Sequence, residues 1–221
     1  MSELLAALCA QRLIALVRAP DRTAMVTGAI AAAKGGVHFL AVPATAHGVA
    51  EIVAELADAG DDLHVGISGV MEADQVSLAL AMDAHFIMSP ICNPEVVRGA
   101  ADRGLLCIAG ASTPSEISAA SSWSPDLLQV FPAGFLGGPD YFKLLHRNFP
   151  HLKLVAGGGV DVDSGPNYLE AGAAAIVIDR GLIPQKREAE AEAIITARAA
   201  ALVEVCNEIG AAAAARLSNP G

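Results

Sequence analysis

Short runs of branched aliphatic residues alternate along the chain with longer stretches rich in alanine and polar residues. Such runs are typical of strands that are buried on both faces, and the stretches between them are long enough to form helices. Regular alternation of this kind favours βα units built around a parallel sheet. We expect strands at Leu13–Val17, Val37–Val42, Leu63–Ile67, His85–Met88, Leu105–Ala109, Leu127–Phe131, Leu152–Ala156 and Ala174–Ile178.

Proline marks several of the expected helix starts, because its fixed φ suits the first turn of a helix. Asn93-Pro94, Thr113-Pro114 and Gly138-Pro139 are of this type. The expected helices are Asp21–Ala33, Gly48–Ala59, Glu72–Ala81, Pro94–Ala101, Pro114–Ala120, Pro139–Asn148 and Val162–Glu170.

A closed (β/α)8 barrel, the TIM barrel, accommodates this pattern better than an open sheet does. We expect one α/β TIM-barrel domain over residues 1–221, with the barrel at about 12–183. Residues 186–217 are predicted to form an extended C-terminal segment of one or two alanine-rich helices.

Composition and charge exclude several classes of partner. The chain is 53% hydrophobic and carries a formal net charge of −10, so nucleic acid and anionic membranes are not expected partners. No apolar run approaches the roughly 20 residues that span a bilayer. The N-terminus begins Met1-Ser2-Glu3 without a basic region, and we therefore expect no signal peptide and a cytoplasmic protein. The scattered Cys9, Cys92, Cys107 and Cys206 are expected to be reduced thiols.

A series of motifs recurs at the predicted strands and their ends: Ile14-Ala15-Leu16-Val17-Arg18, Gly35-Gly36-Val37, Val65-Gly66, Phe86-Ile87-Met88-Ser89-Pro90, Gly110-Ala111-Ser112-Thr113-Pro114-Ser115-Glu116, Phe131-Pro132-Ala133 and Gly157-Gly158-Gly159-Val160. In this order and spacing they resemble the KDPG/KHG aldolases, which cleave 2-keto-3-deoxy-6-phosphogluconate and 4-hydroxy-2-oxoglutarate. The resemblance implies a carbon–carbon lyase scaffold, a 2-keto acid or anion as ligand, no cofactor and a homotrimer.

The predicted sixth strand departs from this family at its most important position. Asp126 to Ala133 resembles the family strand in which a lysine precedes the Phe-Pro-Ala run and forms a Schiff base with the keto acid. Gln129 occupies that position. The lone pair of an amide nitrogen is delocalised into the carbonyl, so Gln129 cannot form an iminium.

Further departures affect the predicted second and third strands. The resemblance places a catalytic glutamate where Ala41 stands, and an arginine that has no counterpart in Pro43-Ala44-Thr45. The family threonine after the third strand is also missing, because the chain reads Ile67-Ser68-Gly69 there. A methyl group supplies none of the roughly 10²–10⁴-fold that acid–base catalysis contributes.

Two functional hypotheses follow. We favour a catalytically degenerate family member, a pseudoenzyme retained for ligand binding or assembly. The alternative is an active lyase or decarboxylase that acts on a small 2-keto acid without a lysine imine and polarises the carbonyl through fixed donors such as Arg18.

No other lysine is placed to substitute. Lys34, Lys143 and Lys186 fall on predicted outer helices. Lys153 lies near the start of the predicted seventh strand, about four residues or roughly 13 Å from the strand exit at which such barrels bind their substrates.

Several residues remain candidates for ligand binding. Arg18 matches a family arginine for the substrate carboxylate, or forms a salt bridge with an acid such as Asp179. Ser89, Pro90 and Phe131 match positions of the pocket wall, although packing explains Pro90 and Phe131 equally well. The set is completed by Gly158, Gly159 and Arg180.

The two glycines are candidates because their backbone N–H groups are expected to be free, in a geometry suited to an anion. Of the two readings of Gly157-Gly158-Gly159, we favour a plain tight turn over an occupied anion site. In the phosphate-binding members a glycine-serine turn after the eighth strand completes the anion cradle. Here that turn reads Asp179-Arg180-Gly181, in which Asp179 repels a phosphate and Arg180 attracts one.

Other site chemistries find little support in the sequence. No metal site is expected, because the carboxylates near strand exits are only Asp161, Asp163 and Asp179, and helix capping explains the first two. Cys92 has no histidine placed beside it by a known motif and is read as an idle thiol. The histidines His38, His64, His85 and His151 begin or precede strands and are expected to be satisfied structural residues.

Overall fold

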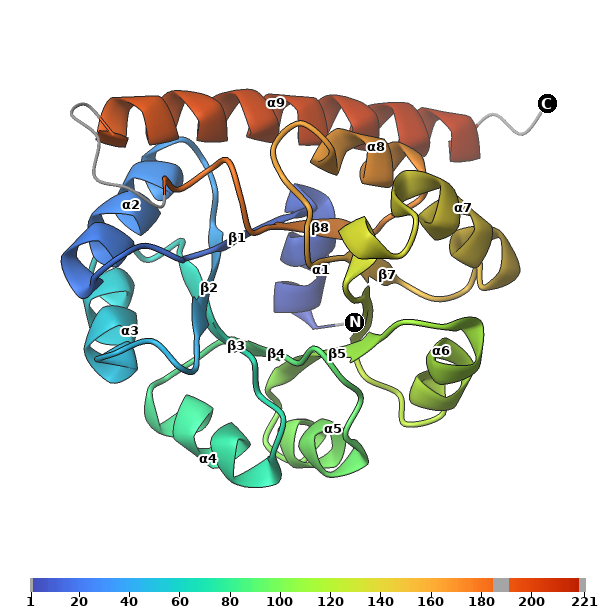
Figure 1. Ribbon diagram of the computed structural model, residues 1–221, viewed down its shortest axis with the longest axis horizontal. Coiled ribbons are helices and arrows are strands. Elements are labelled where there is room, and N and C mark those ends of the chain that lie inside the picture. Colours follow the sequence, from blue (N-terminus) through green and yellow to red (C-terminus); the bar gives the residue numbers. More distant parts are fainter. Residues whose placement is uncertain (1, 185–190, 219–221) are drawn as a thin grey trace.

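Eight parallel strands form a closed barrel in the computed structural model, which describes residues 2–184 and 191–218. Neighbouring strands follow chain order, and β1 pairs with β8 to close the ring (Figure 1). The predicted fold class is confirmed, and each expected strand is present within two residues of its predicted bounds. The strands are β1 Leu13–Leu16, β2 Phe39–Pro43, β3 His64–Ser68, β4 Phe86–Met88, β5 Leu106–Ala111, β6 Leu127–Val130, β7 Leu154–Ala156 and β8 Ala175–Ile178.

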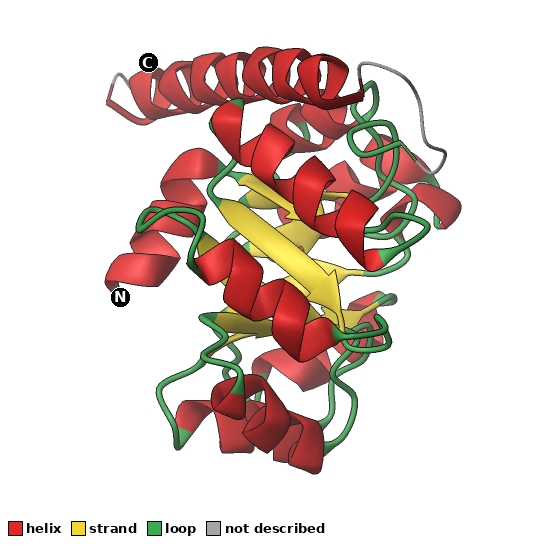
Figure 2. Ribbon diagram, turned by 90° about the vertical axis from the view of Figure 1, so that its left-hand side faces the viewer, coloured by secondary structure: helices red, strands yellow, loops and turns green. Residues whose placement is uncertain are grey.

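Helices surround this barrel, as Figure 2 shows from the side. Between the strands lie α2 Arg22–Lys34, α3 Val49–Ala57, α4 Ala73–Ala81, α5 Pro94–Ala101, α6 Pro114–Ser121, α7 Gly138–Asn148 and α8 Gly165–Glu170, with the 3-10 turn η1 Ala133–Phe135 after β6. The prolines Pro94, Pro114 and Pro139 lie in the first turns of their helices, as predicted. The predicted start of α8 at Val162 is wrong. Asp161 Oδ1 accepts hydrogen bonds from Ser164 N and Oγ in a turn that delays the helix to Gly165.

An N-terminal helix, α1 Glu3–Gln11, was not expected. Its first turn is capped by Ser2, whose hydroxyl accepts from the N–H of Leu5 at 3.2 Å. The side chains of Leu5 and Leu8 join a buried cluster with Ile14 of β1 and Phe39 of β2. Helix α1 therefore covers the amino-terminal end of the barrel interior, opposite the strand exits.

The barrel interior is filled rather than hollow. Interior residues alternate along the strands, as the twofold side-chain period of a strand requires. In β4, the buried ring of Phe86 lies against Gly66 of β3, where a Cβ atom would come within 2.5 Å of the ring. Phe39 of β2 packs 6.1 Å from the Phe86 ring, centroid to centroid.

The C-terminal segment forms a single helix over its described part, α9 Ala191–Ser218, and crosses one side of the barrel (Figures 1 and 2). The first residues of the predicted segment, from Lys186 to Glu190, lie outside the described residues. Close packing on α2 depends on Gly35, whose missing Cβ would lie 2.5 Å from Ala199 Cβ. Thr196 Oγ1 also donates to Ala31 O at 2.9 Å.

Three of the histidines gather at the amino-terminal end of the barrel. His64 lies 4.7 Å from the Phe39 ring and 5.4 Å from the His85 ring, centroid to centroid. His38 Nδ1 contacts Asp62 O, and His85 Nδ1 accepts from Val65 N. The expectation that each histidine is satisfied is wrong for His64, because its buried Nδ1 has no hydrogen-bond partner among the residues described.

This arrangement predicts an acid-sensitive fold. Burial lowers the pKa of His64, with smaller contributions from the charges of His85 and His38, while Asp62 opposes them. The unfolded imidazole takes up a proton near its ordinary pKa, and the folded one resists it. The free energy of unfolding should therefore fall as the pH drops through about 6.5 toward the lowered value. Chemical denaturation at neutral and mildly acidic pH measures this loss.

The variant His64→Gln should lose less stability on acidification than the wild type does. His151→Gln is a matched control, because His151 is exposed and precedes β7. An equal pH dependence in the wild type and His64→Gln would contradict the assignment to His64.

Candidate active site

The alternation of side chains along the strands places two polar residues, Gln129 and Asp179, on the interior side of the barrel. Leu127 of β6 and Val177 of β8 belong to the interior cluster. Two residues further along each strand, the same side is taken by Gln129 and Asp179. Both lie toward the carboxyl ends of the strands, where barrels of this architecture bind their ligands.

Gln129 is buried, with 5% of its surface exposed. It pairs with Gly110 of β5 and Val155 of β7 along the sheet. Its carboxamide packs on Gly157, where a Cβ atom would lie 2.8 Å from Cδ and Nε2 of Gln129. The Oε1 atom is buried and accepts no hydrogen bond from any described residue. An acceptor left in this state typically costs about 1–3 kcal/mol.

The glycines that follow β7 lie beside the Gln129 carboxamide. Gly158 and Gly159 have φ values of +79° and +78°, a region that other residues rarely adopt. Phe131 packs on Gly158, where a Cβ would approach its ring to 2.5 Å. The predicted residues Gln129, Phe131, Gly158 and Gly159 therefore do come together.

The prediction that the N–H of Gly159 is free is wrong. It donates to Asp179 Oδ2 at 2.9 Å. The carboxylate of Asp179 thus accepts the hydrogen bond that we had expected an external anion to accept. The sequence had suggested that Asp179 would repel a phosphate or pair with Arg18, not that it would bind Gly159, which lies 20 residues away in another loop.

Arg180 lies at the same rim and is largely exposed. Its guanidinium carbon is 5.8 Å from the centre of the Phe135 ring, a cation–π arrangement. Its Nε lies 3.8 Å from Asp179 Oδ1, which is an ion pair but too long for a hydrogen bond. Sequence reasoning missed Phe135, a 73% exposed ring in η1.

The other predicted binding residues follow β1 and β4, and Pro90 also lines a pocket outside the barrel. Arg18 is exposed, two residues beyond β1. Ser89 is buried, and its Oγ accepts from Ile91 N at 3.3 Å. Pro90 is half-buried against Gly110, where a Cβ would lie 2.3 Å from the Pro90 carbonyl carbon. These contacts give Ser89 and Pro90 structural partners in addition to any role in binding.

The degenerate positions on β2 and directly after β3 carry no functional group. Ala41 is fully buried in the interior cluster. Gly69 has a φ of +80°, and a Cβ at this position would have no neighbour within 4 Å.

The lysines within the described ranges lie away from the strand exits. Lys34 ends α2 and Lys143 lies in α7, both exposed. Lys153 directly precedes β7 and influences the pKa of Cys9 in α1, which places it at the amino-terminal end of the barrel. Lys186 falls in the segment for which no structure is described.

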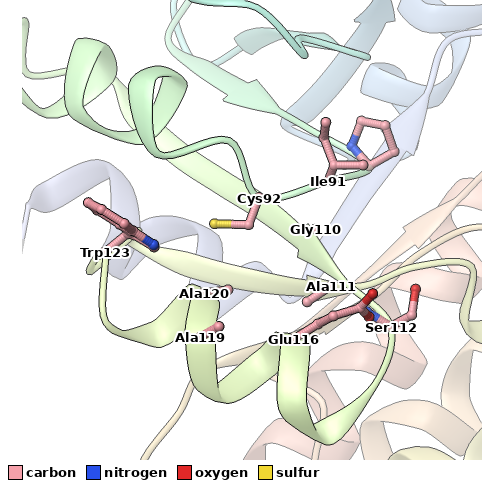
Figure 3. A pocket seen from close by; sticks show the side chains of 10 residues that line it. Ile91, Cys92, Gly110, Ala111, Ser112, Glu116, Ala119, Ala120 and Trp123 are labelled. Atoms are coloured by element: carbon pink, nitrogen blue, oxygen red, sulfur yellow. The ribbon is translucent and has the colours of Figure 1, made fainter.

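A shallow pocket of about 290 Å³ lies outside the barrel, between the end of β4 and helix α6. Figure 3 shows the Cys92 thiol turned toward the side on which Trp123 lies, with Glu116 and Ser112 at the other end. Burial raises the pKa of Cys92, which keeps the thiol protonated and agrees with an idle cysteine. Glu116 is occupied as a cap, because it accepts from Ser112 N and Thr113 N.

No cluster of three metal-ligating side chains occurs within residues 2–184 and 191–218. The same part of the chain contains no helix that is long and apolar enough to cross a bilayer.

Comparison with known proteins identifies the family. A family model described as "KDPG and KHG aldolase" matches residues 5–197. The chain belongs to the KDPG and KHG aldolase family. An aldolase of this family from Pseudomonas aeruginosa, named 2-dehydro-3-deoxy-phosphogluconate aldolase, is 30% identical over 164 residues, which are 73% of this chain and 74% of that protein.

The enzyme of the same name from Treponema pallidum is 28% identical over 135 residues, and the match spans 61% of this chain and 64% of that protein. A solved structure described as native KDPGal superposes with a TM-score of 0.79 at 25% identity, over 90% of this chain and 96% of that one. Membership of an aldolase family, and with it a carbon–carbon lyase scaffold, agrees with the resemblance seen in the motifs.

Proposed function

We propose that this chain binds a small 2-keto acid at the carboxyl end of the barrel without forming a lysine imine, and that it is inactive as a Schiff-base aldolase. The observation that carries the proposal is Gln129, a buried carboxamide on the inward side of β6. We take Gln129 to stand where the family lysine stands, and Ala41 and Gly69 to mark the loss of the accompanying glutamate and threonine.

The amide supports binding rather than covalent catalysis. Its Nε2 can donate to a keto or carboxylate oxygen of the ligand, whereas Oε1 is buried. Neither atom can attack a carbonyl carbon to form an iminium. Arg18, Ser89, Pro90, Phe131, Gly158, Gly159 and Arg180 remain the proposed surroundings of the ligand.

The placement of the lysines agrees with this proposal. Lys34, Lys143 and Lys153 lie on outer helices or at the opposite end of the barrel. The proposal also includes a homotrimer, which the family resemblance implies, and a cytoplasmic location, which the scattered cysteines favour when they are read as reduced thiols.

Borohydride trapping tests the covalent part. Incubation with pyruvate and borohydride should leave the mass of the protein unchanged, because no amine is available to form a reducible iminium. Peptide mapping by mass spectrometry covers all four lysines, including Lys186. A stoichiometric adduct on any of them would refute the proposal.

Calorimetry with pyruvate, at matched pH and without borohydride, tests the binding part. Saturable binding that Gln129→Leu weakens by roughly tenfold is expected, as for the loss of one or two hydrogen bonds. If the wild type decarboxylates oxaloacetate and Arg18→Ala abolishes this turnover, the protein is an imine-free decarboxylase rather than a binding protein.

A further inference from the structure

Asp179 is the second polar group that the alternation of the strands turns toward the barrel opening. It directly follows β8, with Ala175 and Val177 in the interior cluster below it. Its side chain is 16% exposed. Because Asp179 lies where β8 leaves the barrel, its charge acts on whatever occupies this part of the opening.

The two carboxylate oxygens of Asp179 are not equivalent. Oδ2 accepts the N–H of Gly159 at 2.9 Å. Oδ1 is buried and receives no hydrogen bond within the described part of the chain, and Arg180 Nε lies 3.8 Å from it. One oxygen therefore accepts a backbone hydrogen bond, and the other accepts none from the described residues.

This arrangement discriminates between classes of ligand. A backbone N–H beside glycines of positive φ suits an anion, but here an internal carboxylate has taken that place. A second anion at the β7 and β8 exits would lie next to Asp179 and would lose the N–H of Gly159. A neutral hydroxyl group meets no such repulsion and does not compete for the N–H of Gly159.

We propose that Asp179 selects 2-keto acids whose remote end carries neutral hydroxyl groups and rejects those that end in a phosphate. A ligand held at Gln129 and extended over the glycines after β7 places its remote end beside Asp179. Gln129 packs on Gly157, and Asp179 binds Gly159, so one short path along the rim joins the two side chains. The inference rests on the proposed binding function and goes beyond it by naming the ligand class.

A matched pair of ligands tests the proposal. 2-Keto-3-deoxygluconate and its 6-phosphate share the keto acid and differ only at the remote end. In calorimetric titrations of the full chain, the wild type should bind the unphosphorylated acid at least about tenfold more tightly, because the phosphate meets the charge of Asp179 and finds the N–H of Gly159 already taken. Asp179→Asn removes the charge but keeps an acceptor for Gly159 N–H, and it should shrink this ratio.

Asp179→Gly should reverse the preference, because it removes the carboxylate and releases the N–H of Gly159 while Arg180 remains. Asp163→Asn is the matched control: it removes the same charge from an exposed residue between β7 and α8 and should leave the ratio unchanged. The wild-type titrations need no variant to fold, and they decide the matter if Asp179→Gly fails to fold.

The outcomes separate the two proposals. If the wild-type protein binds neither acid, the proposed binding function itself is refuted. Wild-type protein that binds both equally, or favours the phosphate, would overturn the role of Asp179 and leave the binding function standing. An equal shift in Asp163→Asn and Asp179→Asn would reduce the effect to net charge and would also overturn it.

Discussion

The variant Phe86→Ala should lose about 3–5 kcal/mol of unfolding free energy, the largest single effect that we expect on stability. Phe86 is fully buried in the barrel interior, and its ring fills the space that Gly66 leaves open on β3. Truncation removes the apolar area of the ring and leaves a cavity. Glycine has no side chain with which to fill that cavity, and the strands on either side are held in register by the barrel.

Phe135→Ala is the matched control for this prediction. It deletes the same ring from a residue that is 73% exposed and contacts Arg180 across its face, so the free energy should change by no more than about 1 kcal/mol. Urea denaturation followed by circular dichroism measures both variants. Similar losses in the two variants would mean that Phe86 does not fill the barrel as described.

The variant Gln129→Lys should form a covalent adduct with pyruvate in the presence of borohydride, whereas the wild type should form none. The new amine would stand on the inward side of β6 in a buried site, and burial lowers the pKa of a lysine. More of the neutral, nucleophilic form is then present at neutral pH. The amine attacks the keto carbon of pyruvate, water leaves, and hydride from borohydride reduces the iminium to a secondary amine. The mass should increase by that of pyruvic acid less one oxygen, on residue 129.

The control for this variant adds a lysine elsewhere. Asn167→Lys places an amine on the exposed surface of α8 and should give no adduct. If Gln129→Lys folds, as circular dichroism and thermal melting would show, and still yields no adduct, the exit of β6 does not receive a keto acid. That result would remove the pocket on which the proposed function depends.

The barrel was predictable from sequence because its signals are local. Fully apolar strands such as β5 and prolines such as Pro114 at a helix start mark their elements without knowledge of the partners. The N-terminal helix was missed although its signals were present, with a serine cap at Ser2 followed by leucines at helical spacing. A helix before β1 lies outside the repeat of strands and helices, so the repeat itself gives no sign of it.

The site was only partly predictable. Strand alternation and family motifs located Gln129, and its burial agrees with that placement. The bond between Asp179 and Gly159 could not be predicted, because it depends on how two neighbouring loops turn after leaving the barrel. The unpartnered nitrogen of His64 was equally hidden, since a sequence does not say which atoms a fold leaves without partners.

The pairing of β1 with β8 has a consequence for synthesis of the chain on the ribosome. Leu13 of β1 pairs with Ile176 of β8. One edge of β1 therefore stays unpaired until β8 has been synthesised. Helix α9, which packs on α2 through Gly35, is translated later still. Contacts between such distant parts form slowly, and the emerging strands stay open to wrong pairing until they do. A nascent chain stalled before residue 175 would therefore expose an uncovered strand edge, the kind of surface that molecular chaperones protect from aggregation.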